Sequence, residues 1–186
     1  MRSSGSPPSE GVRAFLAAPL AGATRERLSA LWSAAVPGLR LVPPANAHVT
    51  LRFLGQATPA QLERVASLVT PAAAACRAAP ATATGLVLLP PRGAPRVLAL
   101  ALDLPGGFAD LQRACEAAAQ AAGFAPEPRP FRAHVTLGRF GRRVARQPLP
   151  PSEPFPVPLD RVILYRSDAG RAGVTYTALA TFPLAV

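Results

Sequence analysis

Apolar and polar residues recur along this chain with two different periods, which separate helices from strands. Apolar positions three or four residues apart predict amphipathic helices over residues 24–36, 59–78 and 108–122. Short runs that are apolar or alternate, and are rich in β-formers, predict strands over 12–18, 39–42, 46–54, 81–89, 96–102, 134–140, 157–165 and 174–183. This order predicts an α+β fold with mainly antiparallel sheets and helices packed outside.

Turn and capping residues divide these elements. Thr58 before Pro59 is the expected N-cap of the second helix, and Pro71 is expected to interrupt or end its regular part. Gly123 is the expected C-cap of the third helix. Residues 168–173 are expected to connect the last two strands as a hairpin, and the proline-rich 148–151 stretch to be irregular.

One short sequence occurs twice. His-Val-Thr-Leu begins at His48 and again at His134, and these are the only two histidines in the chain. Side chains alternate between the faces of a strand, so His48, Thr50 and Arg52 are predicted to share one face while the apolar residues between them meet the core. His134 and Thr136 repeat the arrangement. We interpret the two copies as one site built twice.

Two imidazoles and two hydroxyls suit phosphoryl chemistry. Imidazole titrates near neutral pH, so one copy can remove a proton from attacking water while the other donates a proton to the departing oxygen. The threonines would hold the phosphate oxygens, and a nearby arginine would neutralise the growing charge. This scheme needs no metal and no cofactor. A metal site here would have few ligands, because no pattern of Cys, Asp or Glu residues accompanies the two histidines.

Composition limits the expected partners and compartment of the protein but does not decide its function. All 20 basic residues are arginine and the net charge is +10, which fits an RNA-binding surface or a compositional bias of the genome. No apolar run is long enough for a membrane span, and Cys76 and Cys115 have no metal-type spacing, so free thiols in a cytoplasmic protein are expected. Residues 1–11 are expected to form a flexible tail before a single domain over 12–186.

The repeated sequence and its flanks resemble the 2H phosphoesterase superfamily, and within it the RNA 2′,3′-cyclic phosphodiesterases, historically called 2′-5′ RNA ligases. The resemblance covers residues 12–184, and its most specific segments are VRAFLAAPL at 12–20, LVPP at 41–44, HVTLRFLG at 48–55, RPF at 129–131, HVTLGR at 134–139 and the closing strand at 176–183. It implies a bilobal α+β fold, with two mainly antiparallel sheets facing a central cleft.

The resemblance also implies an activity. RNA or nucleotides with 2′,3′-cyclic phosphate ends would be hydrolysed to 2′-phosphates without a metal. His48 would act as the acid, His134 as the base, and Thr50 and Thr136 would hold the phosphate. Arg139 matches the arginine that often follows the second motif. One self-contained cleft makes a monomer the simplest expectation.

Other contacts follow less directly. By strict alternation Arg139 points away from His134, unless the strand bends around Gly138 or Arg139 lies at the rim. Arg52 is a second candidate for phosphate contact. Phe131 could stack on a base, as could Phe53, although alternation assigns Phe53 to the core. The arginines at 142–146 could follow an RNA backbone or belong to a solvated loop.

Two other functions remain open at this stage. The first is a related activity, 2′-5′ RNA ligation or cleavage of 2′-5′-linked oligonucleotides, because ligation is close to the reverse reaction. The second belongs to another class, a non-catalytic RNA-binding module that uses the arginine surface. Such a module would bind with a steep salt dependence and show no turnover.

Overall fold

The computed structural model describes residues 11–32, 38–170 and 173–186. Within these ranges the strands are β1 Val12–Pro19, β2 Leu39–Leu41, β3 His48–Ala57, β4 Ala79–Leu89, β5 Val97–Asp103, β6 His134–Phe140, β7 Phe155–Leu159, β8 Arg161–Gly170 and β9 Gly173–Pro183. The helices are α1 Gly22–Trp32, α2 Pro59–Ala75 and α3 Gly106–Ala121, with a 3₁₀ turn η1 at Pro44–Asn46. No helix among the described residues is long and apolar enough to cross a membrane.

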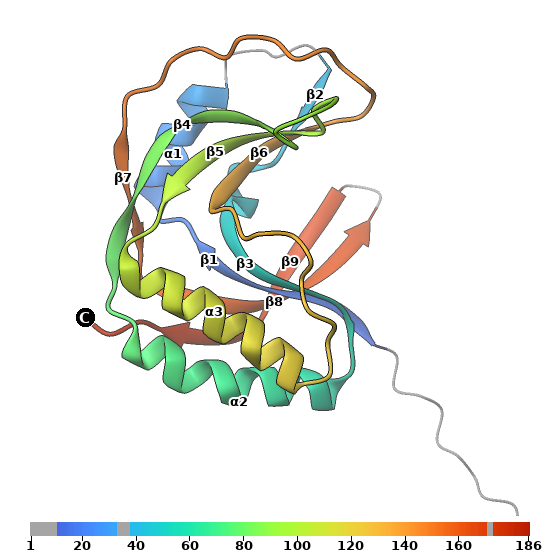
Figure 1. The fold of residues 1–186 in the computed structure, drawn as a ribbon, viewed down its shortest axis with the longest axis vertical. Coiled ribbons are helices and arrows are strands. Elements are labelled where there is room, and N and C mark those ends of the chain that lie inside the picture. Colours follow the sequence, from blue (N-terminus) through green and yellow to red (C-terminus); the bar gives the residue numbers. More distant parts are fainter. Residues whose placement is uncertain (1–10, 33–37, 171–172) are drawn as a thin grey trace, which may run out of the picture.

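The nine strands form one strongly curled sheet in the order β7-β4-β5-β6-β3-β1-β8-β9, with β2 paired to β6 (Figure 1). All of these strand pairings are antiparallel. Helices α2 and α3 lie side by side against the half that contains β3 and β9, and α1 lies by the other half, where Arg27 sits 4.3 Å above the Phe155 ring. The structure confirms the predicted α+β class with helices outside.

Between β3 and β6 the two halves of the sheet meet at a single residue pair, and an isolated bridge joins Arg77 and Ala185 elsewhere. Strands β3 and β6 share only the pairing of Val49 with Val135, and both side chains are fully buried. On one side of this joint lie β1, β8 and β9, and on the other lie β2, β4, β5 and β7. The two predicted sheets are therefore the two halves of one continuous sheet, and each half contributes one copy of the repeated sequence.

Helix boundaries follow the capping residues more closely than the prolines. Thr58 and Gln61 form a capping box at the start of α2, since each side chain bonds the backbone N–H of the other residue. The expectation for Pro71 was wrong, because α2 continues through it and ends at Ala75. At the end of α3, Gly123 adopts φ +90°, the left-handed conformation that glycine tolerates best.

The predicted strand over 157–165 was also wrong, because the chain makes two strands there. Strand β7 pairs with β4 at the edge of the sheet, while β8 pairs with β1 and β9 in the other half. Two consecutive charged residues, Asp160 and Arg161, interrupt the apolar pattern where the partner changes. Pro156 and Pro158 give the physical clue, because residues without an N–H fit an edge strand.

The remaining boundaries agree with the predictions to within three residues where the structure describes them. Helix α1 is observed to Trp32, so the predicted extension to residue 36 lies outside the described residues, as does the tail at 1–10. Strands β8 and β9 pair as far as Gly170 and Gly173, which confirms the hairpin. Cys76 and Cys115 are both buried and free.

Candidate active site

Both copies of the repeated sequence lie at the joint between the halves. Val49 and Val135 are directly opposite and buried, so they share one face of the sheet. The residues on either side of each valine must then lie on the other face, which carries both His-x-Thr pairs. Because the pairing is antiparallel, the two histidines are diagonal neighbours, and such positions are about 7–8 Å apart. The two imidazoles therefore lie close enough to act on the same group, and the charge of His134 lowers the pKa of His48.

The two histidines are oriented by the same hydrogen bond, from the ring to a backbone carbonyl. Nδ1 of His48 donates to the carbonyl oxygen of Asn46 at 2.7 Å, and Nδ1 of His134 donates to that of Arg132 at 2.8 Å. In both cases the acceptor is two residues earlier in the chain. A carbonyl only accepts, so the proton of each neutral imidazole is on Nδ1 and the lone pair is on Nε2. Nε2 of each ring is therefore the atom that can exchange protons with a substrate.

The imidazole of His48 is surrounded by aromatic rings. Its centroid lies 5.0 Å from that of Phe15 and 5.3 Å from that of Tyr176. Thr50 Oγ1 lies 3.1 Å from Nε2 and donates to its lone pair. Burial among these groups lowers the pKa of His48 to about 4; the hydrogen bond to Asn46 opposes this shift, and the charges of His134 and Arg139 add to it. His48 is neutral at pH 7 when no anion is bound.

We expect the pKa of His48 to be visible in both titration and stability. Its NMR titration midpoint should lie near pH 4 in the free protein and move upward when inorganic phosphate binds, because the anion stabilises imidazolium. During acidification, His48 is protonated at a lower pH in the folded protein than in the unfolded chain. The contribution of His48 to stability is therefore complete above pH 6.5 and is lost as the pH falls toward 4, by roughly 3 kcal/mol.

The variant His48→Gln supplies the control for this titration. It should flatten the stability profile between pH 6.5 and pH 4, as measured by urea unfolding, because glutamine does not titrate. His134→Gln assigns the signals, since the chain has only two histidines, and should raise the His48 pKa by removing a like charge. A free-protein midpoint at or above 6.5 for His48 would contradict the buried environment.

Strand β3 does not alternate regularly beyond Thr50. Its pairing with β1 shifts register twice, which leaves Leu51 and Leu54 without partners in β1. These bulges reverse the predicted faces of the next two residues. Phe53 is 48% exposed and its ring lies 6.0 Å from that of Phe15, on the face of the histidines, whereas Arg52 is 7% exposed on the opposite side. The predictions that Arg52 contacts phosphate and that Phe53 packs in the core were wrong.

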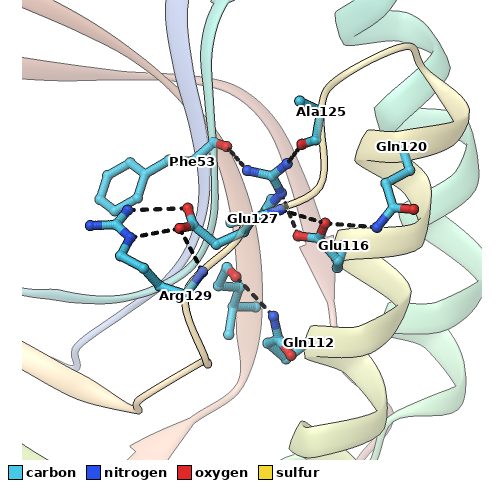
Figure 2. A network of polar contacts seen from close by, with 9 residues as sticks. Phe53, Gln112, Glu116, Gln120, Ala125, Glu127 and Arg129 are labelled. Atoms are coloured by element: carbon cyan, nitrogen blue, oxygen red, sulfur yellow. Dashed lines mark hydrogen bonds and ion pairs between the residues drawn. The ribbon is translucent and has the colours of Figure 1, made fainter.

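Arg52 instead ties β3 to α3 and to the segment that leads to the second motif. Its Nε lies 2.5 Å from Oε2 of Glu116, and its two terminal nitrogens donate to the carbonyl oxygens of Phe53 and Ala125. Figure 2 shows the Glu116 carboxylate also accepting from the Gln120 side chain and from the backbone N–H of Glu127. The network fixes the backbone on both sides of the joint.

Arg139 reaches the cleft because β6 also contains a bulge. The register of β6 against β5 shifts between Thr136 and Gly138, so Leu137 has no partner in β5. Both Leu137 and Gly138 are buried, and Arg139 returns to the face of Thr136, exposed to solvent. Its charge lowers the pKa of His48, which places it within electrostatic range of that ring. Of the two geometries left open by the sequence, the bend at Gly138 is the one observed.

Phe131 and Arg146, two further candidates for contact with RNA, have different surroundings in the structure. Phe131 is 38% exposed in the irregular 122–133 segment, where a stacking role stays a prediction. Arg146 is not a free cation of a solvated loop, because its guanidinium donates to the carbonyl oxygens of Leu88 and Pro90. Arg146 and His134 line a hollow of about 500 Å³, which is also bordered by Leu86, Ala101 and Leu149.

Sequence reasoning missed the groups that surround the motifs. Phe15 and Tyr176 lie against His48 and Tyr165 stacks on Phe15; these rings come from three different strands that only the sheet order brings together. Glu116 lies in α3, where its helical position alone suggests solvent exposure. Within residues 11–32, 38–170 and 173–186, no group of three or more His, Cys, Asp or Glu lies close enough together to hold a metal ion.

Comparison with known proteins agrees with this geometry. The family model described as LigT like Phosphoesterase matches residues 19–99 and 102–176, most of the chain. This chain belongs to that family. An RNA 2′,3′-cyclic phosphodiesterase of Methanothermobacter thermautotrophicus is 30% identical over 183 residues, covering 93% of this chain and 99% of the relative. One from Geobacillus stearothermophilus is 29% identical, and the match covers 91% of this chain and 56% of that relative.

Two solved structures share the whole architecture. The crystal structure of TT0787 from Thermus thermophilus is 28% identical, with a TM-score of 0.75 over 92% of this chain and 97% of the other. Escherichia coli LigT in complex with 3′-AMP is 25% identical, with a TM-score of 0.80 over 94% of this chain and 99% of the other. The curled half-barrel is therefore the fold of the LigT-like phosphoesterase family.

Proposed function

We propose that this protein hydrolyses RNA 2′,3′-cyclic phosphate ends to 2′-phosphates. The observation that carries the proposal is the pair of His-x-Thr motifs placed diagonally across the Val49–Val135 joint, with Nδ1 of each ring held by a carbonyl and Nε2 left to carry the proton exchange. Membership of the LigT-like phosphoesterase family, and relatives described as RNA 2′,3′-cyclic phosphodiesterases, support the substrate class. The 3′-AMP complex of Escherichia coli LigT adds that a member of this fold holds a nucleotide.

The proposed mechanism uses two imidazoles in opposite protonation states. His134 removes a proton from water as the water attacks phosphorus, and the P–O3′ bond breaks. His48 then delivers a proton to the departing O3′, leaving a 2′-phosphate. Thr50 and Thr136 hold the non-bridging oxygens, and Arg139 stabilises the charge that accumulates on them. Each histidine returns to its starting state after one further proton exchange with solvent.

Because the pKa of His48 is low in the free protein, the substrate also has to promote the protonation of this residue. His48 is neutral in the free protein, so it must gain a proton before it can act as the acid. The anionic cyclic phosphate supplies the opposite charge that raises its pKa. Binding is therefore coupled to proton uptake, and the acid is charged when a substrate anion is present.

The direct test is incubation with a short RNA ending in a 2′,3′-cyclic phosphate, in the presence of EDTA. We expect conversion to a 2′-phosphate at the same rate with and without the chelator, and a bell-shaped pH dependence of kcat/KM. The position of the product phosphate is assigned by ³¹P NMR. Turnover that appears only on addition of a divalent metal, or a 3′-phosphate product, would refute the mechanism.

Phe53 is the expected platform for the terminal base. Its ring is exposed on the His48 side of the cleft, where the departing O3′ and its nucleoside must lie. Base stacking on an aromatic ring contributes about 1–3 kcal/mol, so Phe53→Ala should raise KM for nucleoside 2′,3′-cyclic phosphates about tenfold with kcat retained. Phe131→Ala tests the second exposed ring, and Leu179→Ala is the control for loss of an exposed apolar side chain. An unchanged KM in Phe53→Ala would remove Phe53 from the binding site.

A second candidate activity is 2′-5′ RNA ligation, or cleavage of 2′-5′ linkages. The hollow of about 500 Å³ lies beside His134, the proposed base, where the nucleophile enters. Water needs far less room, whereas a nucleoside carrying a 5′-hydroxyl fits a pocket of this size. Adding an RNA with a 5′-hydroxyl to the assay separates the two activities, because ligation yields a longer strand.

We further infer that residues 12–186 act as one bilobal catalytic unit, as a monomer in the cytoplasm. Both histidines and both threonines come from one chain, so the cleft is complete without a partner. Two buried free cysteines agree with a reducing compartment. Sedimentation of the purified protein at working concentration tests the oligomeric state.

A further inference from the structure

Two arginines face each other across the outer end of the cleft. Arg40 of β2 is the direct partner of Arg139 of β6, so their side chains lie on the same face of the sheet. Directly opposed residues have Cβ atoms about 4.5–5.5 Å apart, and like charges in such positions destabilise the pairing. Both side chains are exposed. The fold therefore maintains a repulsive pair beside the proposed phosphate site.

No acidic side chain relieves this repulsion in the part of the chain that the structure describes. The five ion pairs found there use other arginines, namely Arg52, Arg113, Arg129, Arg161 and Arg166. Arg139 already acts on the cleft, because its charge lowers the pKa of His48. Arg40 lies farther out, and its Nη2 is 4.0 Å from where a Cβ on Gly141 would stand.

Further cations continue this line away from the histidines. Beyond Phe140 a hollow of about 320 Å³ is bordered by Arg142 and Arg143, and the Arg142 guanidinium passes the start of β2 at Gly38. The cationic face is therefore longer than one phosphate requires. A ligand with several phosphates along its length matches it, because each phosphate offsets the repulsion between neighbouring arginines.

We propose that Arg40 binds the phosphodiester next to the reacting cyclic phosphate, so that the Arg40–Arg139 pair selects RNA ends over mononucleotides. This rests on the proposed function and adds the substrate length to it. Arg139 serves the reacting phosphate, and Arg40 serves the linkage that joins the terminal nucleotide to the one before it. A nucleoside 2′,3′-cyclic phosphate lacks that linkage and does not use Arg40.

The test compares Arg40→Met with wild type on three substrates: a nucleoside 2′,3′-cyclic phosphate, a dinucleotide ending in the same group, and that dinucleotide with an uncharged methylphosphonate linkage. Arg40→Met should raise KM about tenfold for the charged dinucleotide alone, with kcat unchanged for all three. The salt slope of dinucleotide binding should fall by about 0.7. Arg40→Lys should restore most of the affinity, and Arg64→Met, an exposed arginine on α2, is the matched control.

Stability gives an independent readout. Because Arg40 and Arg139 repel each other, Arg40→Met should leave the Tm of the free protein unchanged or raise it, while the Tm gain from bound dinucleotide shrinks. Equal KM changes for all three substrates, or none for the charged dinucleotide, would overturn the proposal. Wild-type turnover of the mononucleotide tests the proposed function separately, since Arg40 has no part in it.

Discussion

Replacing either histidine should abolish most of the hydrolysis of RNA 2′,3′-cyclic phosphates. General acid and general base catalysis each contribute about 10²–10⁴-fold, so His48→Gln and His134→Gln should each lower kcat about 10³-fold. Glutamine approximates the volume of the imidazole and keeps hydrogen-bonding capacity, so the fold and the KM should change little. The bell-shaped pH profile of kcat/KM should reduce to a single limb in either variant, because one ionisation remains.

The threonines supply a graded comparison. Thr50→Val and Thr136→Val keep the shape of the side chain and remove the hydroxyl, so each should lower kcat about tenfold, far less than the histidine variants. The double variant His48→Gln/His134→Gln should be hardly slower than either single variant, because the histidines act as a unit. Wild-type rates in both single histidine variants would end the case for a two-histidine mechanism, provided that circular dichroism shows them folded.

The largest effect on stability is expected at Glu116. Glu116→Leu should destabilise the protein by about 3–5 kcal/mol, because the Arg52 guanidinium, 7% exposed, is left in the interior without its carboxylate. The double variant Arg52→Met/Glu116→Leu should recover most of this loss, since two apolar side chains of similar size replace the buried pair. Urea unfolding measures both free energies.

The same helix contains a control for that experiment. Arg113 and Asp110 form an exposed ion pair on α3, one turn from Glu116. Exposed pairs contribute about 0–1 kcal/mol, so Asp110→Ala should change the unfolding free energy very little. A loss below about 1 kcal/mol in Glu116→Leu would mean that Arg52 finds water or another acceptor, and that the network does not hold the two halves together.

The sequence predicted most of the strands, the helices and the two motifs because these depend on local periodicity and on an exact repeat. It could not predict which strands become neighbours, so the aromatic ring of Tyr176 beside His48 was not foreseen. Regular alternation failed at Leu51 and Leu137, where bulges exchange the two faces. Those shifts depend on pairing with other strands, which explains why Arg52, Phe53 and Arg139 were the uncertain positions.

Because β3 and β6 pair only at Val49 and Val135, the distance across the active site depends on the angle between the two halves of the sheet. Each half carries one histidine on its own strands, so the gap between the imidazoles depends on the angle between the halves at that joint. The halves are also joined by the Arg52 network, between β3 and the segment leading to β6, and by the bridge between Arg77 and Ala185. Together these attachments set the angle between the halves, and with it the distance between the acid and the base.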